Sequence, residues 1–110
     1  MHAQLTFFDG PRSPELVAAQ ERAGRDRIQP AVTSDPQLRD QLVSLLVLRR
    51  PDGGQVVVTV MQSEAALIRA QEVIMSTELL PGEDAALLPG PDRIEIYEVV
   101  QARTFATVPA

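Results

Sequence analysis

Residues 43–61 read VSLLVLRRPDGGQVVVTVM, and this stretch decides the fold. Its two arms are rich in valine and leucine, side chains that are typical of β-strands. Between them, Pro51-Asp-Gly-Gly54 has the residue types of a tight chain reversal. The stretch therefore predicts a β-hairpin with strands over Val43–Leu48 and Gln55–Met61.

One strand and one helix are expected before the hairpin. Ala3–Phe8 alternates as a strand does, and Asp9-Gly-Pro11 ends it with turn residues. Ser13-Pro-Glu15 is a helix start, because serine caps free amide groups and proline tolerates the first helical position. The helix is expected over about 14–29, followed by a connection from Pro30 to Pro36.

A second helix and a last strand follow the hairpin. Ser63-Glu64 predicts a cap for a helix over 65–76, whose apolar residues recur at helical spacing. Arg93–Val100 is typical of a final strand. Between these elements, Leu79-Leu-Pro-Gly82 and Leu87-Leu-Pro-Gly90 predict two similar turns. The leucine pair of each turn is expected to pack at an edge of the core, and a lid over a ligand is the alternative.

The order of elements, β-α-β-β-α-β, predicts an α+β fold of the ferredoxin-like type with a four-stranded antiparallel sheet. Both helices are then expected on one face of the sheet. A chain of 110 residues suffices for one domain, which we place over residues 1–100. The tail, residues 101–110, keeps Phe105 and Val108, and we expect it to dock on a partner subunit.

Alternation within each strand divides the sheet residues into two sets. The set expected under the helices is Leu5, Phe7, Val43, Leu45, Val47, Val56, Val58, Val60, Ile94 and Ile96. The opposite set is Gln4, Thr6, Phe8, Ser44, Leu46, Leu48, Val57, Thr59, Met61, Glu95, Tyr97 and Val99. A solvent face does not normally carry so many large apolar groups. We therefore expect a homodimer in which a second copy covers this face, sheet against sheet.

Composition argues against several classes of function. The net charge of −5 disfavours nucleic acid and anionic membranes as partners. With no cysteine, the chain has no thiolate chemistry, and it is typical of a cytoplasmic protein. His2 is the only histidine, and Glu95 and Glu98 are expected on opposite faces of their strand, so we expect no metal site and no cofactor. No apolar run reaches the length of a membrane span.

The sequence resembles the dimeric α+β barrel superfamily and, within it, small proteins similar to antibiotic biosynthesis monooxygenases. The resemblance covers roughly residues 3–100 and the whole order of elements. It is carried by LRRPDGG at 48–54 before a valine-rich strand, by QSEAAL at 62–67, and by IYEVV at 96–100. It implies two sheets that form one barrel, with space for a small molecule between them. Some members oxidise polycyclic phenols without metal or flavin, and others degrade haem.

The polar members of the uncovered set are the expected ligand-binding residues. They are the side chains with a hydroxyl or amide group, together with the thioether of Met61: Gln4, Thr6, Ser44, Thr59, Met61 and Tyr97. Three hypotheses follow. The chain is a homodimeric barrel that binds a small apolar or aromatic molecule, a cofactor-independent monooxygenase in which Tyr97 orients the substrate, or a structural or regulatory dimer with a filled interior. No residue is assigned a catalytic role.

Overall fold

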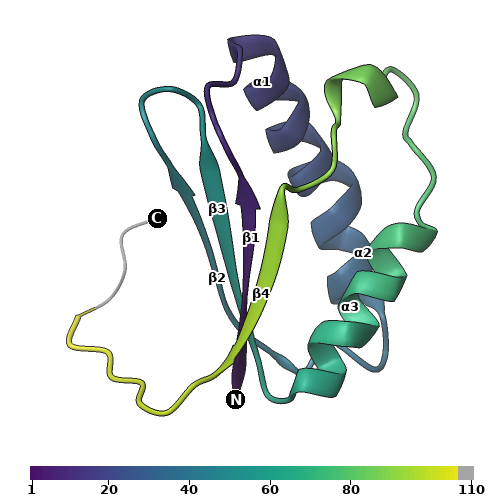
Figure 1. Ribbon diagram of the computed structural model, residues 1–110. Coiled ribbons are helices and arrows are strands. Elements are labelled where there is room, and N and C mark those ends of the chain that lie inside the picture. Colours follow the sequence, from purple (N-terminus) through teal and green to yellow (C-terminus); the bar gives the residue numbers. More distant parts are fainter. Residues whose placement is uncertain (107–110) are drawn as a thin grey trace.

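The computed structural model describes residues 1–106 and has a four-stranded sheet with helices on one face only (Figure 1). The strands are β1 (His2–Phe8), β2 (Leu42–Arg49), β3 (Gln55–Met61) and β4 (Arg93–Glu98). The helices are α1 (Pro14–Ala23), α2 (Gln29–Ser34) and α3 (Glu64–Ser76), with a π-helical turn η1 (Gly24–Ile28) and a 3-10 turn η2 (Ala85–Leu87). The sheet order is β2-β3-β1-β4, and every pair is antiparallel. This confirms the ferredoxin-like prediction.

The first helical segment is longer than predicted. Ser13 caps it as expected, since its Oγ accepts from the amide of Leu16 at 3.2 Å. The helix does not end near residue 29, because η1 joins α1 to α2 and the chain stays helical to Ser34. Pro30 directly follows the π-helical turn η1, whose wider spacing, with the Gln29 amide bonded to the Gly24 carbonyl, lets the chain stay helical although proline has no N–H to donate. The predicted connection is therefore wrong over residues 30–34.

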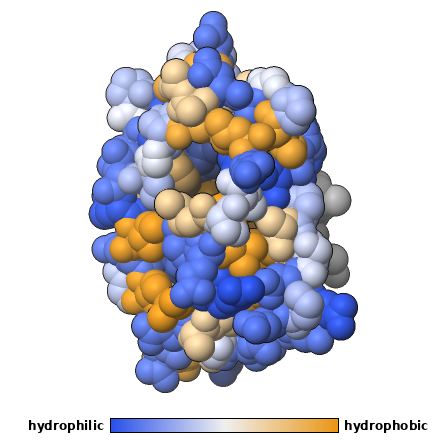
Figure 2. Space-filling model, turned by 90° about the vertical axis from the view of Figure 1, so that its right-hand side faces the viewer, coloured by the Kyte–Doolittle hydropathy of each residue, from blue (hydrophilic) through white to orange (hydrophobic). Residues whose placement is uncertain are grey.

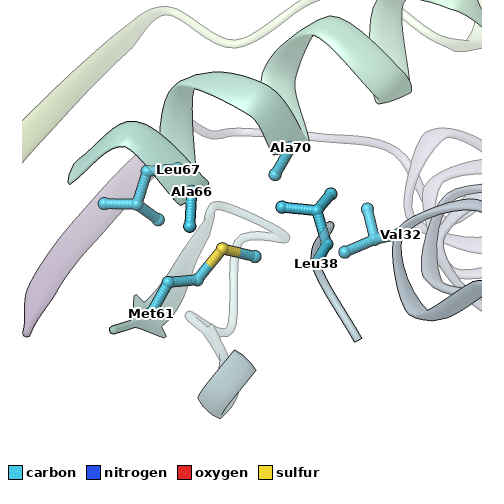
Figure 3. Close-up of a cluster of buried hydrophobic side chains, with 6 residues drawn as sticks. All are labelled: Val32, Leu38, Met61, Ala66, Leu67 and Ala70. Atoms are coloured by element: carbon cyan, nitrogen blue, oxygen red, sulfur yellow. The ribbon is translucent and has the colours of Figure 1, made fainter. Parts of the chain in front are cut away.

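The fully buried core is small and lies at one end of the helix layer (Figure 3). It joins α2, α3, the turn after α2 and the last residue of β3. Its members are Val32, Leu38, Met61, Ala66, Leu67 and Ala70. Two of the three α3 residues in this cluster are alanines, so the helix lies close to the sheet but covers little of it with large groups. Most sheet residues remain only half-buried.

The strand register fixes which residues face the helices. Met61 is 0% exposed and packs in one cluster with Leu67 of α3, so it points into the helix layer. Its neighbour Val60 therefore points away, together with its partner Ala3 on β1. The predicted faces of β1 and β3 are thus interchanged. The helix side receives Gln4, Thr6, Phe8, Val57, Thr59 and Met61, and the opposite side receives Leu5, Phe7, Val56, Val58 and Val60.

The predicted faces of β2 and β4 are confirmed by the same register. Leu45 and Val47 pair with helix-side residues of β3, and Ile94 and Ile96 pair with helix-side residues of β1. Ser44, Leu46, Leu48, Glu95 and Tyr97 lie on the opposite side. Val43 lies at the register shift between Leu42 and Ser44, and Val99 lies beyond the end of β4.

The segment between α3 and β4 is fastened to the first helix by arginines. Arg27 of η1 forms an ion pair with Glu83 at 2.9 Å, and the Glu83 side chain is only 2% exposed. The same oxygen, Oε2 of Glu83, also accepts from the amide of Leu80 at 2.7 Å. Arg22 donates to the carbonyl of Pro81 at 2.8 Å. Three of the four repeat leucines are half-buried, and Leu79 is exposed.

Candidate functional site

The sheet face that carries no helices is called the open face, and its side chains form a regular grid. Cross-strand partners place them in three rows across β4, β1, β3 and β2. The first row is Tyr97, Ala3, Val60 and Ser44; the second is Glu95, Leu5, Val58 and Leu46; the third is Arg93, Phe7, Val56 and Leu48. The polar members are Ser44, Glu95 and Arg93, with the phenol of Tyr97. The rest of the grid is apolar.

The open face leaves much apolar surface in contact with water. Leu48 is 50% exposed and Tyr97 is 53% exposed, although both lie within strands. The chain as a whole exposes 7387 Å², against roughly 6000 Å² for a typical monomer of 12.0 kDa. The side of the molecule with the helices is largely hydrophilic but also carries several apolar patches (Figure 2). On the open face itself, the large side chains that are more than a third exposed are Leu46, Leu48 and Tyr97, and its valines, Leu5 and Phe7 are half-buried.

The first row of the grid is the candidate site. Its middle positions are Ala3 and Val60, which are among the smallest side chains of the face, so the floor is lowest there. Tyr97 and Ser44 stand at its two ends and each carries a hydroxyl group. These end strands are three strand spacings apart, about 14 Å. The row is thus an apolar floor with a hydrogen-bonding group at each end.

The other rows set the charge around that floor. Glu95 lies two residues from Tyr97 on the same strand and face. Arg93 lies 4.0 Å from Glu95 and 3.7 Å from Asp9, measured between their charged atoms. The Arg93 guanidinium also sits 3.7 Å above the ring of Phe7, which it partly covers. The third row is therefore capped by a cation, while the first row has one carboxylate beside it.

The structure separates the six predicted ligand residues. Ser44 and Tyr97 lie together on the first row of the open face, as predicted. The other four, Gln4, Thr6, Thr59 and Met61, face the helices, so the prediction that all six line one surface is wrong. Gln4 donates to the hydroxyl of Thr6 at 3.3 Å, and Met61 is buried in the core.

Two hollows on the helix side were not predicted. Gln4 lines one of ≈ 380 Å³ between α3 and β4, with Ile68, Met75, Ile94 and Ile96 among its walls. The other, of ≈ 330 Å³, lies between α1 and the β2–β3 turn. Arg49, one of the three arginines that line this hollow, is paired with Glu21 at 2.7 Å. Both are open to solvent at the edge of the helix layer.

The titratable residues do not gather into a metal centre. Within residues 1–106, no three histidine or carboxylate side chains are placed to hold one ion. His2 lies on the helix side, with its Nε2 at 4.0 Å from a carboxylate oxygen of Glu64. Glu98 is the register partner of His2, while Glu95 lies on the open face, so the two glutamates point to opposite sides as predicted. None of the described helices has the length and apolar character required to cross a membrane.

Comparison with known proteins supports the fold and goes no further. No family model matches the chain. No curated protein matches it either. Among solved structures, the chain is similar to a dimeric ferredoxin-like protein from an uncultured marine organism, with a TM-score of 0.53 and 12% sequence identity. The match covers 97% of this chain and 90% of the other. At this identity the similarity shows a shared ferredoxin-like fold.

Proposed function

We propose that the protein is a homodimeric α+β barrel that binds a small, neutral, largely apolar or aromatic molecule between its two sheets. The observation that carries the proposal is the first row of the open face, Tyr97–Ala3–Val60–Ser44. In the proposed dimer the partner's sheet covers this row from above, and the row itself forms an apolar surface with a hydroxyl group at each end. The solved relative named above is itself a dimeric ferredoxin-like protein.

The dimer is supported by the area that a second copy would cover. Four strands at about 4.8 Å spacing, each six or so residues long, make a face of about 400 Å² before side-chain relief. Nine of the twelve side chains on this face are apolar or aromatic, so covering the apolar share on two protomers is worth on the order of 15 kcal/mol at about 25 cal/mol per Å². This offsets the about 4–15 kcal/mol that association costs in lost freedom. A twofold axis satisfies both faces at once.

The ligand class follows from the chemistry of the first row. An apolar floor favours flat or aliphatic groups, and the hydroxyls of Tyr97 and Ser44 each accept or donate one hydrogen bond. Glu95 lies beside Tyr97, and the chain has a net charge of −5, so an anionic ligand is disfavoured. A neutral molecule of two or three fused rings with a hydroxyl or carbonyl group matches these features.

Tyr97 makes the proposal directly testable, because the chain has one tyrosine and no tryptophan. Its fluorescence therefore reports on the open face alone. We expect titration with a neutral naphthoquinone to quench this fluorescence with saturation at micromolar concentration. Ala3→Leu fills the floor and is expected to abolish quenching, while Ala65→Leu on the exposed surface of α3 is the matched control. Quenching that Ala3→Leu leaves unchanged contradicts the site, and a dimer that binds no neutral aromatic probe indicates a filled interior.

A second candidate function is a cofactor-independent monooxygenase of the antibiotic biosynthesis type. It is favoured by the half-exposed phenol of Tyr97 on the proposed binding floor, where it is positioned to hydrogen-bond a phenolate or quinone oxygen of a bound ring. Oxygen uptake with a panel of hydroquinones tests this function, and Tyr97→Phe is expected to lower the rate. Uptake that is equal in wild type and Tyr97→Phe contradicts the role of Tyr97. Binding without uptake favours the binding protein.

A further inference from the structure

The edge strand β2 carries apolar side chains on both of its faces. Leu46 and Leu48 belong to the open face, while Leu45 and Val47 point to the helix side and are still exposed. β2 is the edge of the sheet, so its outer backbone groups also have no strand partner. A second sheet packed on the open face covers only the first two of these side chains. Covering Leu45 and Val47 requires another element that passes around the edge.

The segment after β4, residues 99–106, has the properties of that missing element. Val100 is 88% exposed and Phe105 is 89% exposed. Beyond the bond from the Val99 amide to the carbonyl of Met1, no residue of 100–106 makes a backbone hydrogen bond to the rest of the described chain. The segment leaves β4 on the side of the sheet opposite the helices (Figure 1). That is the side on which the proposed dimer places the second protomer. Val108 lies outside the described residues.

A twofold dimer whose axis runs parallel to the strands brings this segment to the correct edge. The sheet order is β2-β3-β1-β4, so β2 and β4 are its two edges. A twofold axis that runs parallel to the strands reverses this order in the facing sheet. It therefore places the partner's β2 opposite β4, where the tail begins. Eight extended residues reach at most about 27 Å; about 10 Å of this crosses between the packed sheets, and the remaining about 17 Å is enough to run along β2 from Leu42 past Leu45 to Val47.

We propose that residues 99–106 of each protomer dock along the outer edge of β2 of the second copy and cover Leu45 and Val47. We call residues 99–106 the C-terminal arm. This inference rests on the proposed homodimer and adds to it that the two protomers exchange their arms. The backbone of the segment supplies the hydrogen bonds that the edge lacks, as in strand addition. Val100 and Phe105 supply apolar contacts. The same arm closes the edge of the barrel beside Ser44, at one end of the candidate binding floor.

Cross-linking between single-cysteine chains tests the exchange, because the natural chain has no cysteine. A tagged chain with Val47→Cys is refolded together with an untagged chain with Phe105→Cys, and a short bismaleimide is added. We expect a cross-linked species that contains one tagged and one untagged chain. Met75→Cys, on the exposed surface of α3, replaces Val47→Cys in the control, and no mixed species is expected there.

A second measurement uses charge in the arm. The double variant Val100→Asp/Phe105→Asp is expected to raise the dimer dissociation constant at least tenfold, while Met75→Asp leaves it unchanged. A dimer that shows no mixed cross-link, and whose dissociation constant the double variant leaves unchanged, overturns the exchange of arms and leaves the dimer standing. A cross-link within a single chain that carries both cysteines, without the mixed species, also overturns it. A folded single-chain mass for the wild type overturns the proposed dimer itself.

Discussion

Replacing Val58 by aspartate places a charge at the centre of the proposed interface. Val58 occupies the second row of the open face, between Leu5 and Leu46, and has no charged neighbour in that row other than Glu95 at its end. In a single chain the new carboxylate is in contact with water, so the fold tolerates it. In the dimer the second sheet removes that water. Val58→Asp is therefore expected to disrupt association and to leave the fold of each protomer intact.

The magnitude follows from burial and symmetry. Val58 is already half-buried within one chain, so dimerisation gains about 1 kcal/mol from covering the rest of it. An unpaired carboxylate adds at least about 1–3 kcal/mol of desolvation. Because a twofold axis introduces the change twice, the total is at least about 4 kcal/mol. This corresponds to an increase of about 1000-fold in the dissociation constant.

Sedimentation velocity from nanomolar to high micromolar concentration measures the dissociation constant. Circular dichroism of the same samples confirms that the variant is folded. Ile68→Asp, on the exposed surface of α3, introduces the same charge in place of an aliphatic side chain and serves as the matched control. If Val58→Asp changes the dissociation constant by no more than the control does, the open face is not the interface and the reasoning is refuted.

Three further predictions concern stability. Leu67→Ala empties a fully buried position in the small core and is expected to lower the free energy of unfolding by about 3 kcal/mol in urea titrations; a loss below about 1 kcal/mol contradicts its core role. Gly53→Ala is expected to destabilise by more than about 1 kcal/mol, because Gly53 has a φ of 89° and a Cβ there would lie 2.5 Å from the carbonyl of Arg12; unchanged thermal denaturation would contradict this. The Leu80 amide, and then Arg27, lower the pKa of Glu83. Because its pKa is lower in the folded state, the carboxylate stabilises the fold fully above about pH 4.5 and loses this effect as the pH falls through its folded value. The stability difference between wild type and Glu83→Gln is thus expected to shrink in acid, and a difference that is constant with pH argues against the ion pair as its source.

The arrangement of elements was predictable because it depends on local signals. The hairpin turn Pro51–Gly54 and the serine caps Ser13 and Ser63 each have a physical reason that acts over a few residues. In the structure, Ser63 accepts from the Ala66 amide at 3.1 Å, and Asp52 accepts from the Gly54 amide at 2.8 Å within the turn. Each element is therefore found near its predicted place. The end of the first helical segment was not predictable, because Pro30 usually ends a helix, whereas here it follows the π-helical turn η1 and the chain stays helical to Ser34.

The faces of β1 and β3 were not predictable from apolar alternation alone. Both faces of each strand carry large apolar groups, so the period of two gives two sets without saying which one the helices cover. Apolar content predicts that the more apolar residues of β1 and β3 face the protomer's own helices, whereas in the structure these residues lie on the open face. One local signal favoured the observed arrangement. Met61 stands two residues before the cap at Ser63, so it lies where the chain turns into the helix layer.

The candidate site was predictable only in part for the same reason. Tyr97 and Ser44 lie on the strands whose faces were assigned correctly, and they remain candidate ligand residues. Gln4 and Thr59 changed sides with their strands. The floor between the two hydroxyls, made by Ala3 and Val60, has no chemical motif in the sequence. Only the register of the sheet reveals it.

The central claim is that the open face of the sheet is covered by a second copy of the chain. Light scattering coupled to size-exclusion chromatography measures the molar mass of the folded protein at micromolar concentration directly. The expected result is twice the chain mass of 12.0 kDa. A folded protein with the mass of one chain, its apolar sheet exposed to water, would contradict the account.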